Sequence, residues 1–169
     1  MAYTMPNYVE KIRVPVRVSE SARPAAVGYL CLSPVANWHE GPENLYDLLN
    51  SEVRVLPFHR HEDGAILLFT RMNISHVTVG PEVEPQFVRS RLIAVTKEEH
   101  VLVEMEDGIK LEGNLLVELP EHLNRASDYL NLPEDFFPLV TRQGAVFVNK
   151  TKVRVTRVFA KSPKPVPVP

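Results

Sequence analysis

The feature that most constrains this chain is an ordered internal repeat of about 60 residues. Short blocks in the first half return in the second half in the same order, with gaps of only a few residues. The clearest pair is Gly28 in "VGYLCLS" and Gly113 in "EGNLLVE", each followed by a short apolar run. The other pairs are Asp47 with Asp128, Leu49 with Leu130, Asn50 with Asn131, Pro57 with Pro138, Gly64 with Gly144, Asn73 with Asn149, and Val77 with Val153.

Two interpretations of this series are open. Either the chain is a tandem repeat, or two β-rich segments share generic strand and turn patterns. We favour the tandem repeat because the order of the blocks is kept throughout.

Each unit opens on an alternating run that predicts a half-buried strand, since apolar residues at every second position share one face. The apolar positions are Ile12, Val14, Val16 and Val18 in the first unit and Val101, Val103 and Met105 in the second. In the second unit Asp107 and Gly108 predict a tight hairpin turn that needs a positive φ. Gly113 then lies early in the next strand, where a side chain would obstruct a sharply bent strand of a small barrel.

A short helix is expected next in each unit, over 44–50 and 125–131. Asn44 and Asn124 are the expected N-caps. Asp47 and Asp128 are expected to cap or tie down these helices, and Asn50 and Asn131 mark ends where a left-handed residue is common. Helices this short need a sheet to pack on.

The predicted organisation is a first unit over 10–80, a linker or bridging strand over 81–99, a second unit over 100–160 and a disordered Pro-rich tail over 161–169. Within the linker, "QFVRSRLIAV" is expected as a strand between the units. The tail "KSPKPVPVP" is polyproline-II-like.

Composition agrees with many short strands and fixed turns, because prolines (15) outnumber glycines (7). The formal net charge of -2 gives no global attraction to nucleic acid or to an anionic membrane. Cys31 is the only cysteine, so no internal disulfide forms, which fits a reducing compartment. No signal peptide and no apolar run of roughly 20 residues is seen, so we expect a cytoplasmic protein without a membrane partner.

The second unit resembles the Sm/LSm-like small barrels. Gly108 and Gly113, followed by Leu115, resemble the first signature of that family. The stretch "ELPEHLN" is similar to its Asp-x-x-Met-Asn, with Asn124 one residue late, and "FVNKTKVRV" resembles its second signature. The family has Arg-Gly where this chain has Asn149 and Lys150, so the arginine that stacks on an RNA base is missing.

The chain is also similar to a bacterial family of uncharacterised short domains, and that resemblance implies no activity. Its blocks are "DG…EG", "RxSDxLN", "FxPL" and "VNKxxI/V". Here they correspond to Asp107, Gly108, Glu112 and Gly113; to Arg125, Ser127, Asp128, Leu130 and Asn131; to Phe137, Pro138 and Leu139; and to Val148, Asn149, Lys150 and Val153.

Catalytic and metal chemistry have few candidates. His59 and His61 in "FHRHEDG" would share one strand face, as metal ligands can, or simply end a polar strand before an Asp-Gly turn. Cys31 lies in an apolar strand without a base beside it and is expected to be an inert thiol. No phosphate loop or Ser-His-Asp spacing occurs, so we expect no enzyme activity, no cofactor and no dedicated metal site.

The last strand and one loop are the expected contact regions. Lys150, Lys152 and Arg154 alternate and would share one face, opposite Val153 and Val155. Arg157, Lys161 and Lys164 extend the positive charge, which could meet phosphate or an acidic partner, or protect an edge strand from aggregation. Trp38 in "VANWHEGPEN" would either contact a partner or cover the end of the barrel.

The sequence therefore predicts an all-β fold with short helices, built as two tandem small SH3/Sm-like barrels that form a pseudo-dimer. The expected function is a non-enzymatic binding or adaptor module that mediates protein assembly, including assembly into a homo-oligomer. The alternative is an RNA- or nucleotide-binding module that uses the basic last strand.

Overall fold

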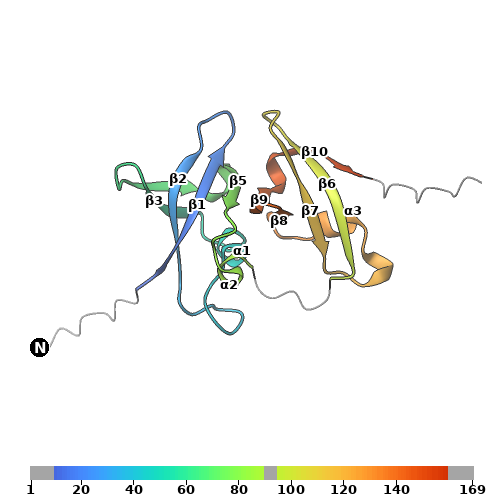
Figure 1. Ribbon diagram of the computed structural model, residues 1–169, viewed down its shortest axis with the longest axis horizontal. Coiled ribbons are helices and arrows are strands. Elements are labelled where there is room, and N and C mark those ends of the chain that lie inside the picture. Colours follow the sequence, from blue (N-terminus) through green and yellow to red (C-terminus); the bar gives the residue numbers. More distant parts are fainter. Residues whose placement is uncertain (1–9, 90–94, 160–169) are drawn as a thin grey trace, which may run out of the picture.

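The computed structural model describes residues 10–89 and 95–159 and contains mostly strand with a few short helices, which confirms the all-β prediction (Figure 1). No helix among these residues is long and apolar enough to span a membrane. In chain order the elements are β1 (Ile12–Glu20), β2 (Ala26–Leu32), α1 (Leu45–Leu49), β3 (Val55–Arg60), β4 (Ile66–Thr70), η1 (Arg71–Asn73), β5 (Ile74–Val79), α2 (Pro85–Val88), β6 (Lys97–Met105), β7 (Lys110–Val117), η2 (Glu121–Leu123), α3 (Ala126–Leu130), β8 (Phe136–Thr141), β9 (Gly144–Asn149), η3 (Lys150–Lys152) and β10 (Val153–Val158).

The strands form one open antiparallel sheet in the order β10-β6-β7-β8-β9-β5-β1-β2-β3-β4. Its first five strands repeat the order of its last five, so that β10 corresponds to β5, β6 to β1, β7 to β2, β8 to β3 and β9 to β4. The two halves appear as separate lobes in Figure 1 and join where β5 pairs with β9. Within the described residues, β4 and β10 are the unpaired edges of the sheet.

The two halves share their strand register as well as their strand order. Gly28 lies opposite Val16 in the β1–β2 hairpin, and Gly113 lies opposite Val101 in the β6–β7 hairpin. Pro57 lies opposite Leu68, just as Pro138 lies opposite Phe147. The ladders of β1 with β5 and of β6 with β10 each contain one register shift, at the matching place.

The sequence alignment was wrong in the last third of the repeat. Thr70 and Asn149 are the N-caps of η1 and η3, so Asn149 corresponds to Thr70 rather than to Asn73. Val153 begins the last strand of its half and corresponds to Ile74, not to Val77. The error arises because the 3-10 turns carry no apolar pattern that would reveal their presence.

Alternating apolar residues, mostly valines, form the core, because side chains at every second position of a strand point to the same face of the sheet. Val14, Val16 and Val18 are buried on one face of β1, and Val101, Val103 and Met105 on one face of β6. Each half has its own apolar cluster. The cluster of the first half also contains two side chains from the second half, Phe136 and Phe147, so the joint between the halves is itself part of a core.

Both glycines singled out in the second strands stand where backbones crowd. A Cβ on Gly28 would lie 2.0 Å from the carbonyl oxygen of His59 and 2.7 Å from the ring of Phe58. A Cβ on Gly113 would lie 2.9 Å from the carbonyl oxygen of Val140. Gly108 has a φ of 88°, as its hairpin turn requires.

The helices α1 and α3 lie within the expected ranges, but their caps differ. The expected left-handed ends are wrong, because φ is -102° at Asn50 and -89° at Asn131. Asn44 caps α1 by accepting from the backbone N–H of Asp47, whose carboxylate accepts in return from the N–H of Asn44. Asn124 is not the N-cap of α3; that position is Arg125, whose backbone N–H donates to Asp128.

The predicted bridging strand over 86–95 is wrong in its first part, because residues 85–88 form α2. Pro85 stands in its first turn, where proline's fixed φ suits a helix start. β6 begins at Lys97, inside the predicted 81–99 linker. Residues 90–94 and the predicted tail over 161–169 lie outside the described residues, as does the N-terminus over 1–9.

Candidate functional site

The joint between β5 and β9 shows how this sheet binds another strand edge, and we call it the internal junction. It is an antiparallel ladder that buries apolar side chains from both halves. Its opposed pairs are His76 with Val148, Val77 with Phe147, Thr78 with Val146, and Val79 with Ala145.

Asn50 extends the internal junction beyond the ladder. Its Nδ2 donates to the carbonyl oxygen of Phe136 at 3.1 Å, and its Oδ1 accepts from the N–H of Phe136 at 2.8 Å. This side chain therefore satisfies both backbone groups of Phe136, as a neighbouring strand would. The matching residue of the second half, Asn131, is exposed at the end of α3.

Asn149 and Arg71 add two further links across the internal junction. Asn149 is fully buried and donates from Nδ2 to the carbonyl oxygens of Met72 and Ile74, at 3.1 and 2.8 Å. Arg71 is buried at its side chain and pairs with Asp135 at 3.1 Å. Buried polar and charged side chains whose hydrogen bonds are all made favour a single register of the interface.

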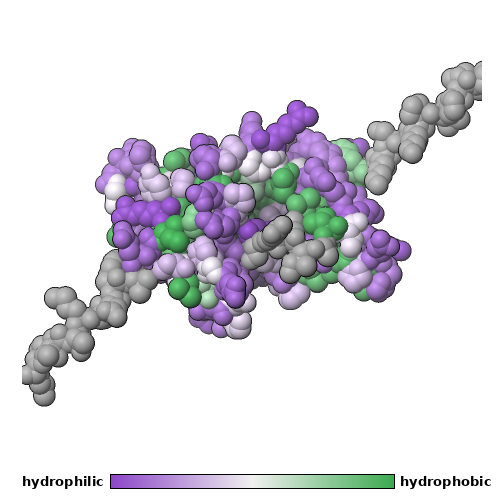
Figure 2. Space-filling view, turned by 60° about the horizontal axis from the view of Figure 1, so that its bottom comes forward, coloured by the Kyte–Doolittle hydropathy of each residue, from purple (hydrophilic) through white to green (hydrophobic). Residues whose placement is uncertain are grey.

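The two outer strands, β4 and β10, carry the corresponding positions, and no strand among residues 10–89 and 95–159 pairs with their outer edges. On β4, Ile66 and Leu68 are 60% and 68% exposed, although Phe147, which corresponds to Leu68, is fully buried. On β10, Val155 and Val158 are 44% and 45% exposed, although their counterparts His76 and Val79 are buried. Figure 2 shows apolar residues in separate patches between hydrophilic ones on the face it presents.

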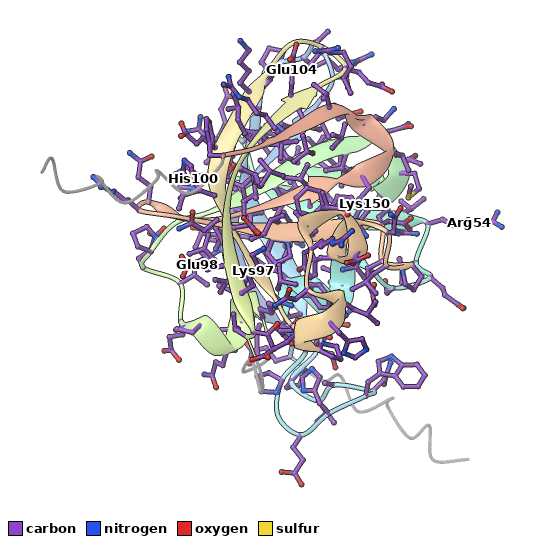
Figure 3. The ribbon with its side chains drawn as sticks, turned by 90° about the vertical axis from the view of Figure 1, so that its right-hand side faces the viewer. Arg54, Lys97, Glu98, His100, Glu104 and Lys150 are labelled. Carbon is purple, nitrogen blue, oxygen red and sulfur yellow. The ribbon has the colours of Figure 1, made fainter. Side chains whose placement is uncertain are left out.

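The expected basic face of the last strand does not form. Lys150, Lys152 and the residue between them make up η3 rather than strand, so their side chains do not alternate with that of Arg154. Nζ of Lys150 donates to the carbonyl oxygen of Leu132 at 2.8 Å, and burial lowers the pKa of this lysine. Lys150 is half-buried, whereas Arg54 is exposed and points away from the molecule (Figure 3).

The other charges of β10 are also engaged. Arg154 donates to Glu104 of β6 at 2.7 Å, and this hydrogen bond lowers the pKa of the Glu104 carboxyl. Arg157 lies over the ring of Phe159 at 5.3 Å. Val155, expected on a buried face opposite the charges, is exposed. Positive charge on this strand is thus divided among separate contacts.

His59 and His61 do not share a strand face, because β3 ends at Arg60 and His61 lies in the following turn. His59 lines a hollow with Cys31 and Glu43, and His61 lines another with Arg23 and Phe69. Across the described parts of the chain, no group of three or more His, Cys, Asp or Glu residues could hold a metal ion.

Trp38 stands free on the loop that precedes α1 and is 89% exposed, so it does not cover the core. In the same loop Nε2 of His39 lies 2.5 Å from Oδ2 of Asp47. Hydrogen bonds to the backbone of Glu40 and to Asp47 raise the pKa of His39. This pair fixes the loop to the first turn of α1.

Sequence reasoning missed the three polar residues of the internal junction. From the sequence, Asn50 is predicted as a member of the repeat and a helix end, and Asn149 as a member of the repeat and a departure from a family motif. Arg71 carries no sequence-based prediction. One signal was available: an asparagine directly before a Lys-Thr-Lys stretch can accept from the backbone two residues on and start a turn, as Asn149 does with Thr151.

Asn50 and Asn131 provide a matched pair of variants because they hold the same place in the two halves. We expect Asn50→Ala to lower the free energy of unfolding by about 2 kcal/mol, since it leaves both backbone groups of Phe136 without partners. Asn131→Ala should change it by less than about 0.5 kcal/mol, because that side chain is exposed. Urea unfolding followed by circular dichroism measures both. Equal effects would contradict the role given to Asn50.

His76 should make the internal junction sensitive to acid. Burial lowers its pKa in the folded protein, with Asp107 acting in the opposite direction. The unfolded chain therefore binds a proton first, so the stability that neutral His76 contributes is lost as the pH falls below about 6.5. Wild type should lose more unfolding free energy than His76→Gln between neutral and mildly acidic pH.

His100→Gln is the control for that titration. Hydrogen bonds to Asn114 and Glu112 raise the pKa of His100, so it favours the folded state as the pH falls. Relative to wild type, this variant should lose more stability on acidification, the opposite sign to His76→Gln. The same sign for both variants would refute the assignment.

Comparison of the chain with models of known protein families, with curated proteins and with solved structures found no match.

Proposed function

We propose that this protein is a non-enzymatic assembly module of the cytoplasm, built from two tandem copies of one small SH3/Sm-like unit fused as a pseudo-dimer. It binds protein partners through the open edges of its sheet. The observation that carries this proposal is the apolar strand β4, where Ile66 and Leu68 are exposed and which, among the residues the structure describes, pairs only with β3.

Natural sheets usually protect an edge with lysine, proline or a bulge. β4 has the sequence "ILLFT", with no lysine and no proline, and its ladder with β3 has no bulge. Its outer edge is therefore open to another strand. A strand that adds there gains backbone hydrogen bonds along the ladder and packs side chains on Ile66 and Leu68. The internal junction demonstrates the same kind of contact within one chain, at β9.

The alternative of RNA binding has less support. Lys150, Lys152 and Arg154 were expected to form one positive face, yet they lie on two different elements and two of them are bound to protein groups. Single-strand binders also use aromatic platforms beside the charges. RNA therefore enters as an outcome of the test.

The test is capture of partners from native cell extract on immobilised protein, with nucleic acid measured in the eluate. Wild type is compared with two double variants. The β4 variant carries both Ile66→Lys and Leu68→Lys. The control carries both Val27→Lys and Ile109→Lys, which alter exposed apolar residues elsewhere. We expect protein that the wild type and the control retain and the β4 variant loses. Equal capture by all three, or an eluate dominated by RNA, would overturn the proposal.

A further inference from the structure

We propose that the partner of the β4 edge is the β10 edge of a second copy of this chain, paired in the register of the internal junction. This inference rests on the proposed function and names its partner. It follows from the correspondence between the inner pair of strands, β5 and β9, and the outer pair, β10 and β4.

The register transfers residue by residue. β10 runs along β6 as β5 runs along β1, so Val155 corresponds to His76 and Val158 to Val79. β4 pairs with β3 in the same register as β9 pairs with β8, so Leu68 corresponds to Phe147. The pairs predicted between two copies are Val155 with Phe69, Thr156 with Leu68, Arg157 with Leu67, and Val158 with Ile66.

Side-chain burial points to the same contact. Exposed apolar residues lie on both outer strands at positions that the internal junction covers. Val55, 43% exposed at the start of β3, corresponds to Phe136, which is fully buried against the other half. A second copy in this register would cover Ile66 and Leu68 of one chain with β10 of the other, and Val55 with the end of α3, as burial of apolar surface favours.

Asn131 is placed to extend this contact. Asn50 binds the N–H and the carbonyl of Phe136 across the internal junction. In the outer contact the corresponding groups are the Asn131 side chain of one copy and the backbone of Val55 in the other. Asn131 is exposed, so its amide is available to a second chain.

One ion pair of the internal junction has a counterpart of different charge in the outer contact, where two cations face each other. The counterpart of the Arg71–Asp135 pair is Lys150 of one copy facing Arg54 of the other. Glu134 and Asp135 lie near Lys150 and act on it electrostatically, and one carboxyl oxygen of Glu134 is buried without a hydrogen-bond partner. These acids offset the two cations, and Arg54 is exposed and points outward from its chain (Figure 3).

The contact joins unlike edges, so it is heterologous and leaves one free edge at each end of a pair. Repeated addition then gives a closed ring if the rotation between copies closes, and an open chain otherwise. An isologous dimer of β4 with β4, or of β10 with β10, is a different contact and is excluded by this proposal.

Edge-blocked variants test the contact. The β4 variant carries Ile66→Lys and Leu68→Lys, and the β10 variant carries Val155→Lys and Val158→Lys. Sedimentation equilibrium measures the average mass of the wild type as its concentration is raised. At roughly 1 mM protein, where even weak contacts are populated, this mass should exceed that of one chain. Each variant alone should associate about 100-fold more weakly, because lysines would be buried in the contact.

An equimolar mixture of the two variants should form a one-to-one dimer and nothing larger, because one intact β10 edge and one intact β4 edge remain. Circular dichroism checks that both variants fold, and the Val27→Lys, Ile109→Lys control should associate like the wild type. A wild type that stays monomeric, or a single variant that associates as strongly as the wild type, would overturn the proposal.

Disulfide trapping tests the register without charged substitutions. In a Cys31→Ser background, a Thr156→Cys chain mixed with a Leu68→Cys chain should cross-link between copies, since directly opposed residues lie within disulfide reach. A Val158→Cys chain mixed with the Leu68→Cys chain is out of register and should cross-link much less. Equal yields would overturn the register.

The two proposals fail separately. If the wild type is monomeric yet the β4 variant loses a captured protein, the edge binds another protein and only the second-copy inference falls. If neither self-association nor capture depends on β4, both fall.

Discussion

Gly28→Val is expected to lower the free energy of unfolding by about 3 kcal/mol. The first side-chain atom alone would meet the His59 carbonyl oxygen at 2.0 Å and the Phe58 ring at 2.7 Å. The oxygen belongs to the backbone of the paired strand β3, so it cannot move away without opening the β2–β3 ladder. Urea unfolding monitored by circular dichroism gives the difference.

Gly113→Val supplies the internal comparison, since Gly113 holds the same place in the second half. Its nearest neighbours stand farther away, at 2.9 and 3.1 Å, so we expect a smaller loss of about 1 to 2 kcal/mol. Val27→Thr, on the exposed face of β2, should change stability by less than about 0.5 kcal/mol. A Gly28→Val protein as stable as wild type would show that β2 and β3 do not cross as closely as described.

Asn149→Leu is expected to cost about 3 kcal/mol, for a different reason. Leucine is similar in size but cannot donate to the carbonyl oxygens of Met72 and Ile74, nor accept from Thr151. Each buried polar group left without a partner costs about 1 to 3 kcal/mol. Because the two carbonyls belong to the other half, the loss should weaken the internal junction itself.

The matched control is Thr70→Leu, which changes the corresponding N-cap on the exposed edge strand. Thr70 makes no side-chain cap bond, so the unfolding free energy should stay within about 0.5 kcal/mol of wild type. Comparable losses for Asn149→Leu and Thr70→Leu would mean that the buried amide does not tie the halves together.

The parts of this fold that depend on local chemistry could be predicted from the sequence. Alternating valines on β1 and β6 identify strands because period two places them on one buried face. The hairpin at Gly108 follows from the positive φ of a tight turn. Asn44 caps α1 because its side chain suits the first turn of a helix.

The last strand shows why local patterns were insufficient elsewhere. "NKTKVRV" reads as one continuous alternating strand, yet its first part turns through η3 and only Val153–Val158 pairs with β6. The turn is fixed by Asn149, whose side chain accepts from the backbone N–H of Thr151. An asparagine has many roles, and which one it takes here depends on the carbonyls of a distant segment.

The internal junction could not be predicted from the sequence either. β5 and β9 each read as an apolar strand, and nothing in their order says that they pair with one another. Their pairing depends on shape and on contacts such as that between Asn50 and Phe136, which lie far apart in the chain. The lysines and arginines near the last strand did suggest an edge strand at β10, but no pattern in the sequence indicates that β4 is the other edge.

The pairing of β5 with β9 is the central claim, because the proposed outer contact copies it. The most direct test is to measure cross-strand nuclear Overhauser effects by NMR. The protein to use is the β4 variant, which carries both Ile66→Lys and Leu68→Lys and should be monomeric. We predict effects between the backbones of Val77 and Phe147 and between those of Thr78 and Val146, in the antiparallel register of the ladder. Two halves without such effects, or a β5 paired with any other strand, would contradict the account.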